Sequence, residues 1–167
     1  MHLDNTAAIV TGAASGLGAA TAAHLADRGA TVYGLDLEKA VACVVPSAGV
    51  HLVPADVTDD EQVRAAVGRI RYHGQQLRLA VNCAGIAPSA RILSRNGPHD
   101  LDPFHNVLKV NLLGTFNVLR LAAEAMSELT PTTEASAASS STPPRSPPTR
   151  PRSGRSPTPP PRPVWPA

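Results

Sequence analysis

Apolar and polar residues alternate in blocks along the first 129 positions of the chain. Buried parallel strands are predicted at four short apolar runs: Ala7–Val10, Thr31–Leu35, His51–Val53 and Leu79–Val81. Longer stretches with apolar residues at helical spacing separate these runs. Strands that alternate with helices predict an α/β fold built on a doubly wound parallel sheet.

The first two helices are located by the residues at their ends. One is predicted over Leu17–Arg28, because Gly29 follows at the position of a C-terminal cap. The other begins at about Asp59, where three successive acidic residues suit the positive end of a helix dipole. Its apolar residues recur at the spacing of one helix face: Val63, Ala66, Val67 and Ile70.

A longer helix is predicted from Pro103 onward, and it is apolar on more than one side. One stripe consists of Phe104, Leu108, Leu112, Thr115, Leu119, Ala122 and Met126. A second group of apolar residues widens this stripe: Val107, Val110, Leu113, Val118 and Leu121. A helix of this kind needs two packing partners, for example its own sheet and another subunit.

The composition changes sharply near residue 130. Twelve of the 17 prolines lie between Pro131 and Pro166, and residues 135–167 contain only Ala, Ser, Thr, Pro, Arg, Gly, Val and Trp. Such a segment cannot bury enough apolar surface to fold. We therefore expect a folded domain over residues 1–129 and a disordered Pro/Arg/Ser-rich tail over residues 130–167. No strand or helix pattern returns after Ser127, so the expected domain is a truncated one.

Charge divides near the same boundary. Residues 1–134 contain 10 Lys and Arg against 13 Asp and Glu, whereas the remainder contains five Arg and no acid. Those arginines alternate with prolines instead of forming a dense basic run interleaved with aromatics, so nucleic-acid binding is not expected. The sequence has neither a signal-peptide pattern nor an apolar run of membrane-spanning length. We therefore expect a soluble, cytoplasmic protein.

Metal binding is not expected either. The two cysteines, Cys43 and Cys83, lie in apolar stretches, and neither has a second Cys or a His at metal-ligand spacing. The six histidines are scattered along the chain. Free buried thiols in a reducing compartment are the simplest interpretation.

A glycine-rich turn follows the first predicted strand. Gly12, Gly16 and Gly18 lie at a strand-to-helix junction, where missing side chains allow a tight turn and close approach of the backbone to a pyrophosphate. The N–H groups of the helix N-terminus face such phosphates. Asp36 ends the second strand, 18 residues after Gly18. Its carboxylate can accept hydrogen bonds from both ribose hydroxyls and would repel a 2′-phosphate. The pattern predicts a Rossmann-type site that prefers NAD to NADP; a turn without a ligand is the alternative.

Four motifs occur in a characteristic order. They are T-G-x-x-x-G-x-G from Thr11, Asp56-Val57 after the third strand, Asn82-Cys83-Ala84-Gly85 after the fourth, and Asn111 in the long helix. Residues 6–129 thereby resemble the short-chain dehydrogenase/reductase family, and the strings PADVTDD, AVNCAGIA and VNLLGTFNVLRLAA are similar to type II 3-hydroxyacyl-CoA dehydrogenases. The resemblance implies a homo-oligomeric, NAD-dependent oxidoreductase whose small-molecule substrate is a secondary alcohol, namely a 3-hydroxyacyl-CoA.

The resemblance also implies roles for single residues. The dinucleotide would contact Ser15, Leu17, Asp36, Asp56, Val57 and Cys83, with Asp56 and Val57 near the adenine. The alternative for Asp56 is a helix-entry residue only. For the segment Asn82, Cys83, Ala84 and Gly85, the alternative to cofactor binding is a turn at the end of the sheet.

The chemistry of the family requires a tyrosine as general base, a lysine that lowers its pKa and a serine that holds the substrate oxygen. The family places Tyr and Lys as Y-x-x-x-K. Here the tyrosines are Tyr33 and Tyr72, and the residues four positions later are Leu37 and Gln76. Of the catalytic tetrad of the family only Asn111 is present, so we expect the chain as written to be inactive.

The tail can be interpreted as the catalytic segment of the family translated in the wrong reading frame from about Ala135 onward. The string GVIVNTASVAA, written in GC-rich codons and read one base late, becomes residues 138–148, and AYSASKAGVAGM becomes residues 157–167. The lost serine codon would span residues 144 and 145 and the lost tyrosine codon residues 157 and 158, thirteen residues apart as in the family. A natural Pro/Arg-rich linker with P-x-x-P character is the alternative.

Two functions are consistent with the sequence. Descent favours an NAD-dependent dehydrogenase. The loss of Ser, Tyr and Lys favours a non-catalytic dinucleotide-binding or partner-binding fragment. Turnover of an acyl-CoA with NAD discriminates between them.

Overall fold

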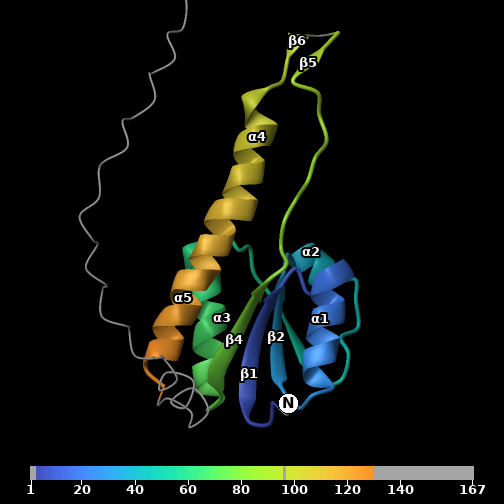
Figure 1. Cartoon of the computed structure of the whole chain (residues 1–167). Coiled ribbons are helices and arrows are strands. Elements are labelled where there is room, and N and C mark those ends of the chain that lie inside the picture. The colour runs from blue at the N-terminus through green and yellow to red at the C-terminus, as the bar shows by residue number, and fades with distance from the viewer. Residues whose placement is uncertain (1–2, 96, 130–167) are drawn as a thin grey trace, which may run out of the picture. The chain divides into compact units, whose positions relative to one another are not determined.

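The computed structural model describes residues 3–95 and 97–129, and these residues form a four-stranded parallel sheet (Figure 1). The strands are β1 (Thr6–Thr11), β2 (Thr31–Asp36), β3 (Val50–Pro54) and β4 (Gln76–Asn82), in the order β3-β2-β1-β4. Each predicted strand is confirmed, and each extends beyond the apolar run that predicted it. The tail that we expect to be disordered, residues 130–167, lies outside the described residues.

The remaining elements connect these strands. They are α1 (Gly16–Ala26), α2 (Glu38–Val41), α3 (Asp60–Tyr72), the short hairpin of β5 (Leu93–Ser94) and β6 (Gly97–Pro98), α4 (Leu101–Leu108), the π-helical segment η1 (Lys109–Gly114) and α5 (Thr115–Ser127). Within the described residues, no helix is both long enough and apolar enough to cross a bilayer.

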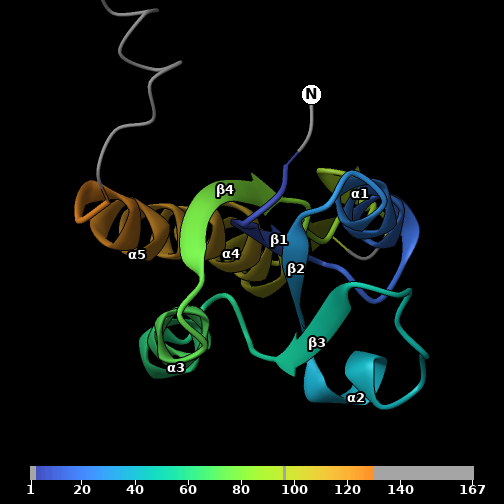
Figure 2. The same ribbon diagram turned by 90° about the horizontal axis from the view of Figure 1, so that it is seen from below.

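Helices cover both faces of the sheet, as a doubly wound fold requires. α1 lies on one face, and α3 and α5 lie on the other (Figure 2). Successive side chains of a strand point to opposite faces of the sheet. Ala8 and Val10 of β1 therefore pack in the cluster with α1, whereas Ala7 and Ile9 pack with α3 and α5. The expected Rossmann-type α/β fold is therefore confirmed.

α3 begins where its sequence predicts. The side chain of Asp59 is the N-cap and accepts a hydrogen bond of 3.1 Å from the backbone N–H of Gln62. The four residues predicted for its apolar face are all buried: Val63, Ala66, Val67 and Ile70.

The long helix differs from its prediction. It begins at Leu101 instead of Pro103, and η1 interrupts it, so α4 and α5 do not share one helical period. The predicted stripe does not follow one buried face: Phe104 and Leu108, which precede η1, are exposed, whereas Ala122 in α5 is buried. Leu112 and Leu119 of the predicted stripe are exposed, whereas Val118 and Leu121 of the second group are buried. A second partner for the exposed side stays a prediction.

Candidate dinucleotide site

The glycine-rich turn joins the end of β1 to α1, and each glycine has its own reason to lack a side chain. Gly12 has a positive φ of 67°, and a Cβ there would lie 3.0 Å from the backbone of Ala84. A Cβ on Gly18 would lie 2.1 Å from the carbonyl oxygen of Gly12. Gly16 has a φ of 53° with open space around it. The turn thus packs tightly against the sheet and leaves the N-terminus of α1 open, where the first N–H groups have no partner inside the helix.

Asp36 ends β2 beside this turn. Its Oδ2 accepts a hydrogen bond of 2.9 Å from the N–H of Ala14, and its Oδ1 accepts one of 2.8 Å from the N–H of Leu37. Both carboxylate oxygens are therefore oriented by backbone donors. The carboxylate lies at the rim of the turn that would receive the pyrophosphate.

Asp56 and Val57 follow β3. The Oδ1 atom of Asp56 accepts hydrogen bonds of 2.8 Å from both the N–H and the hydroxyl of Thr58, which closes a local turn. Asp59 caps α3, and Asp56 stabilises the turn before the helix, so both cofactor binding and a role at the helix entry stay open for Asp56.

The segment Asn82–Gly85 is tied to β1 through a buried hydroxyl. The Oγ1 atom of Thr11 accepts hydrogen bonds of 3.0 Å from the N–H groups of both Cys83 and Ala84. Thr11 is 1 % exposed, so this fork lies inside the molecule. It brings the end of β4 against Gly12.

Asn111 lies in η1, and its side chain makes two hydrogen bonds to one backbone residue. Its Oδ1 accepts from the N–H of Ile86 at 2.8 Å, and its Nδ2 donates to the carbonyl of Ile86 at 2.9 Å. A Cβ on Gly85 would lie 3.2 Å from Asn111 Oδ1. The predicted catalytic Asn111 therefore fixes the chain after β4 to the long helix.

These segments enclose an open cavity of about 570 Å³ at the carboxyl ends of the strands. It brings together eleven of the residues predicted to bind cofactor: Gly12, Ser15, Gly16, Leu17, Gly18, Asp36, Asp56, Val57, Cys83, Ala84 and Gly85. Asn82 and Asn111 do not line it. The cavity also has lining residues that the sequence patterns do not predict: Leu35, Leu37, Ala55, Ile86, Asn106 and Val110. Two of these residues, Asn106 and Val110, lie one helical turn apart just before Asn111, and this spacing places them on one face of the helix. That spacing is a sequence signal from which they could be predicted.

Neither tyrosine reaches this cavity. Tyr33 is buried under α3, where its hydroxyl and Nδ1 of His73 are hydrogen-bonded at 3.0 Å, and burial raises the pKa of the hydroxyl. Tyr72 is 88 % exposed at the end of α3. Across the described ranges, no three His, Cys, Asp or Glu side chains are placed to hold a metal ion.

Comparisons with known proteins identify the family. The family model described as short chain dehydrogenase matches residues 6–135. The 3-hydroxyacyl-CoA dehydrogenase type-2 of Bos taurus is 41 % identical over 129 residues, which cover 74 % of this chain and 49 % of the relative. The corresponding human protein is also 41 % identical over 129 residues, with the same coverage of both chains. A short chain dehydrogenase from Burkholderia cenocepacia, solved in complex with NADP, superimposes with a TM-score of 0.63 at 32 % identity, covering 75 % of this chain and 50 % of that structure.

The chain belongs to the short chain dehydrogenase family. Its relation to 3-hydroxyacyl-CoA dehydrogenases, expected from the sequence, is confirmed. The chain spans about half the length of the curated relatives that it matches.

Proposed function

We propose that residues 1–129 form the NAD-binding part of an oxidoreductase that acts on the secondary alcohol of a 3-hydroxyacyl-CoA. The proposal that the chain binds a dinucleotide is supported by the cavity formed by the glycine-rich turn, Asp36 and the Asp56–Val57 turn. The relatives named 3-hydroxyacyl-CoA dehydrogenase support the substrate class.

The residues present fit a dinucleotide. Gly16 has open space where a side chain would stand, at the N-terminus of α1, which suits a pyrophosphate. Asp36 suits a ribose with two free hydroxyls, because a carboxylate beside a 2′-phosphate places like charges together. This carboxylate supports NAD, although a structural relative was solved with NADP. When bound, the nicotinamide supplies a hydride acceptor; the residues of this chain bind and orient the dinucleotide.

We further propose that the polypeptide of these 167 residues binds the dinucleotide without turnover. No Y-x-x-x-K occurs in the sequence, and Tyr33 and Tyr72 lie away from the cavity. The match to the family model ends at residue 135, where the tail composition begins, which supports the proposal that the tail is translated out of frame.

Calorimetry with the purified 1–167 chain tests the binding half of this proposal. We expect NAD to bind more tightly than NADP, and equal affinities would contradict the role of Asp36. A parallel assay of NADH formation from 3-hydroxybutyryl-CoA should give the background rate, because general acid–base groups contribute about 10²–10⁴-fold. The chain with its reading frame restored after about codon 134 is the matched control, and its turnover of the same substrate tests the substrate class.

A further inference from the structure

Asn117 is a polar side chain on the buried face of α5. It is 8 % exposed and lies among the core residues Val118, Leu121 and Ala122. A buried amide requires hydrogen-bond partners. Its Nδ2 donates to the carbonyl oxygen of Val57 at 2.9 Å, and Val57 lines the candidate dinucleotide site. α5 is therefore joined directly to the rim of that site.

Gly114, about one helical turn before Asn117, also contacts Val57. A Cβ on Gly114 would lie 2.6 Å from Cγ2 of Val57, so the missing side chain lets Val57 pack against the long helix. The side chain of Val57 thus meets Gly114 while its carbonyl meets Asn117. Both contacts come from the segment that also carries Val110, which lines the same cavity.

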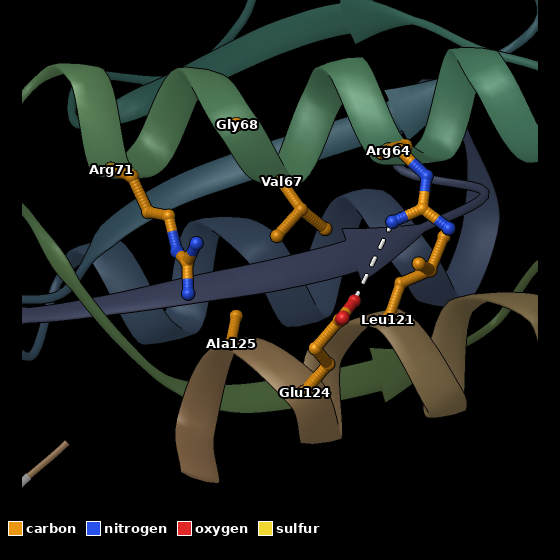
Figure 3. A pocket seen from close by; sticks show the side chains of 7 residues that line it. All are labelled: Arg64, Val67, Gly68, Arg71, Leu121, Glu124 and Ala125. Carbon is orange, nitrogen blue, oxygen red and sulfur yellow. Dashed lines mark ion pairs between the residues drawn. The ribbon is translucent and has the colours of Figure 1, made fainter. Parts of the chain in front are cut away.

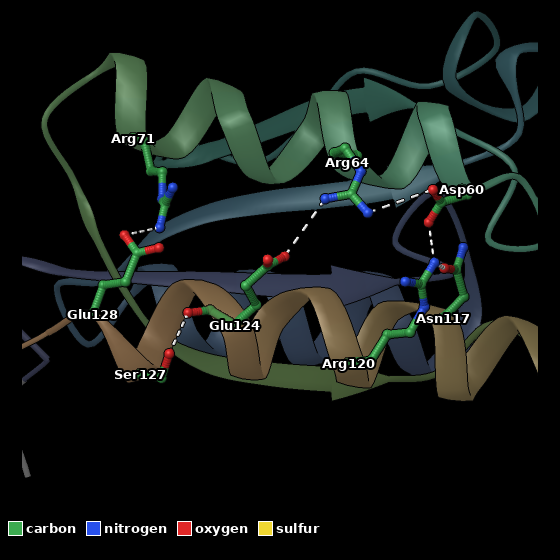
Figure 4. A network of polar contacts seen from close by, with 8 residues as sticks. All are labelled: Asp60, Arg64, Arg71, Asn117, Arg120, Glu124, Ser127 and Glu128. Atoms are coloured by element: carbon green, nitrogen blue, oxygen red, sulfur yellow. Dashed lines mark hydrogen bonds and ion pairs between the residues drawn. The ribbon is translucent and has the colours of Figure 1, made fainter.

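Arg120 determines which way the amide of Asn117 points. Its Nη2 donates to Oδ1 of Asn117 at 2.7 Å. Because a guanidinium only donates and a carbonyl only accepts, one orientation of the amide satisfies both neighbours. Arg120 in turn pairs with Asp60 at the first turn of α3 (Figure 4).

This arrangement continues as a row of ion pairs between α3 and α5. Arg64 lies 3.5 Å from Asp60 and 3.5 Å from Glu124, and Arg71 pairs with Glu128 (Figure 4). Arg64, Arg71 and Glu124 also line a small pocket of about 120 Å³ between the two helices (Figure 3). All these side chains are about half exposed, and exposed pairs contribute little to stability. The row therefore adds little to the stability of the contact between the two helices.

The other hydrogen bonds of the Asp56–Thr58 turn are local or lead to α3. The carboxylate of Asp56 bonds to Thr58, and the N–H of Asp56 donates to Gln62 at 2.9 Å. Among the hydrogen bonds of the described residues, the one from Asn117 connects this turn to α5. Loss of that bond would remove the hydrogen bond between this turn and α5 and leave Val57 held there by its packing against Gly114.

We propose that Asn117 is a positioning residue of the dinucleotide site, which sets the place of Val57 relative to the wall formed by the long helix. This inference rests on the proposed function, since it assigns to Asn117 the adenosine end of the dinucleotide, near Asp56 and Val57. Asn117 does not line the cavity, so it acts through the carbonyl of Val57.

The test compares Asn117→Ala with Arg71→Ala in the full 167-residue chain. Arg71→Ala is the matched control, because it removes a polar contact between the same two helices without reaching Val57. We expect Asn117→Ala to weaken binding of both NAD and ADP-ribose by about tenfold, the scale of one buried hydrogen bond. Arg71→Ala should leave both affinities unchanged. The proposal is overturned if Asn117→Ala lowers the melting temperature but leaves both dissociation constants at the wild-type value.

Amide hydrogen exchange, measured without ligand, separates this proposal from the proposed function. We expect faster exchange over residues 55–59 in Asn117→Ala than in Arg71→Ala or the wild type. Unchanged exchange in that segment would reject the positioning role even if binding fell. A wild-type chain that binds neither NAD nor ADP-ribose rejects the proposed function, and with it the part of this inference that concerns adenosine.

Discussion

Replacement of Gly18 by alanine is predicted to destabilise the protein at the start of α1. A Cβ at this position would lie 2.1 Å from the carbonyl oxygen and 2.6 Å from the carbonyl carbon of Gly12. Both are backbone atoms, so the overlap can be relieved only if α1 or the glycine-rich turn moves. Gly68 offers the matched control, since it lies inside α3 and a Cβ added there would have nothing within 4 Å.

The two substitutions should change stability in opposite directions. Alanine in place of glycine inside a helix gains about 0.5–1 kcal/mol, and this gain applies to Gly68→Ala in full. At Gly18 the overlap costs about 1–3 kcal/mol or more, as overpacking does, and outweighs that gain. Native domains are stable by only about 5–15 kcal/mol. For a domain of this size, about 1 kcal/mol shifts the melting temperature by roughly 4 °C.

Thermal and urea denaturation of the two variants and the wild type measure this difference. We expect Gly68→Ala to melt a few degrees above the wild type and Gly18→Ala to melt well below it. Gly18→Ala should also lose NAD affinity, because the turn that receives the pyrophosphate must shift. A Gly18→Ala protein as stable as the wild type would refute the claim that the helix packs against Gly12 without room for a methyl group.

Three further predictions concern the cofactor, a surface ion pair and the gene. Asp36→Asn should reduce the ratio of NAD affinity to NADP affinity measured by calorimetry, whereas the control Glu38→Gln, which removes a nearby charge, should leave this ratio unchanged. An unaltered affinity ratio in Asp36→Asn would contradict the role of Asp36 in the preference for NAD. The hydrogen bond and charge of Arg71 lower the pKa of Glu128, so the pair stabilises the fold above the ordinary carboxyl pKa, and this contribution disappears as pH falls through the lowered value. Urea denaturation should therefore show a difference between Glu128→Gln and the wild type at pH 7, small because the pair is exposed, and this difference should shrink as the pH is lowered through the carboxyl range. Sequencing of the gene should show that the nucleotides from about codons 130–134, read one base earlier, encode N-T-A-S and then Y-x-x-x-K thirteen residues past the serine. Absence of these strings from both alternative reading frames would reject the hypothesis that the tail is translated out of frame.

The strands and the glycine-rich turn could be predicted because their signals are local. Each strand is a short apolar run, and the run at Ala7–Val10 ends in a turn whose glycines meet backbone atoms of neighbouring segments. Asp36 was predicted from its place at the end of a strand, where parallel strands collect their ligand-binding residues. Short-range pattern and strand geometry were sufficient for these residues.

The long helix and its contacts were harder to predict, because they depend on the packing of distant segments. η1 changes the helical period, and within it the amide of Asn111 bonds to Ile86, 25 residues earlier in the chain. Asn117 is one polar residue in an apolar stretch of the sequence, and its partner Val57 lies 60 positions away. Periodicity cannot report such a pairing.

Dinucleotide binding and proton transfer place different demands on a chain, and the residues around the candidate site suit the first. Binding at the carboxyl ends of parallel strands needs glycines, backbone N–H groups and one oriented carboxylate, and β1, α1 and Asp36 provide these. A tyrosine base needs a cationic neighbour that brings its pKa down toward the working pH. Tyr33 experiences the opposite effect, because burial raises the pKa of its hydroxyl, which is hydrogen-bonded to His73 outside the cavity. This contrast supports the proposal that the chain binds NAD and leaves 3-hydroxybutyryl-CoA unoxidised.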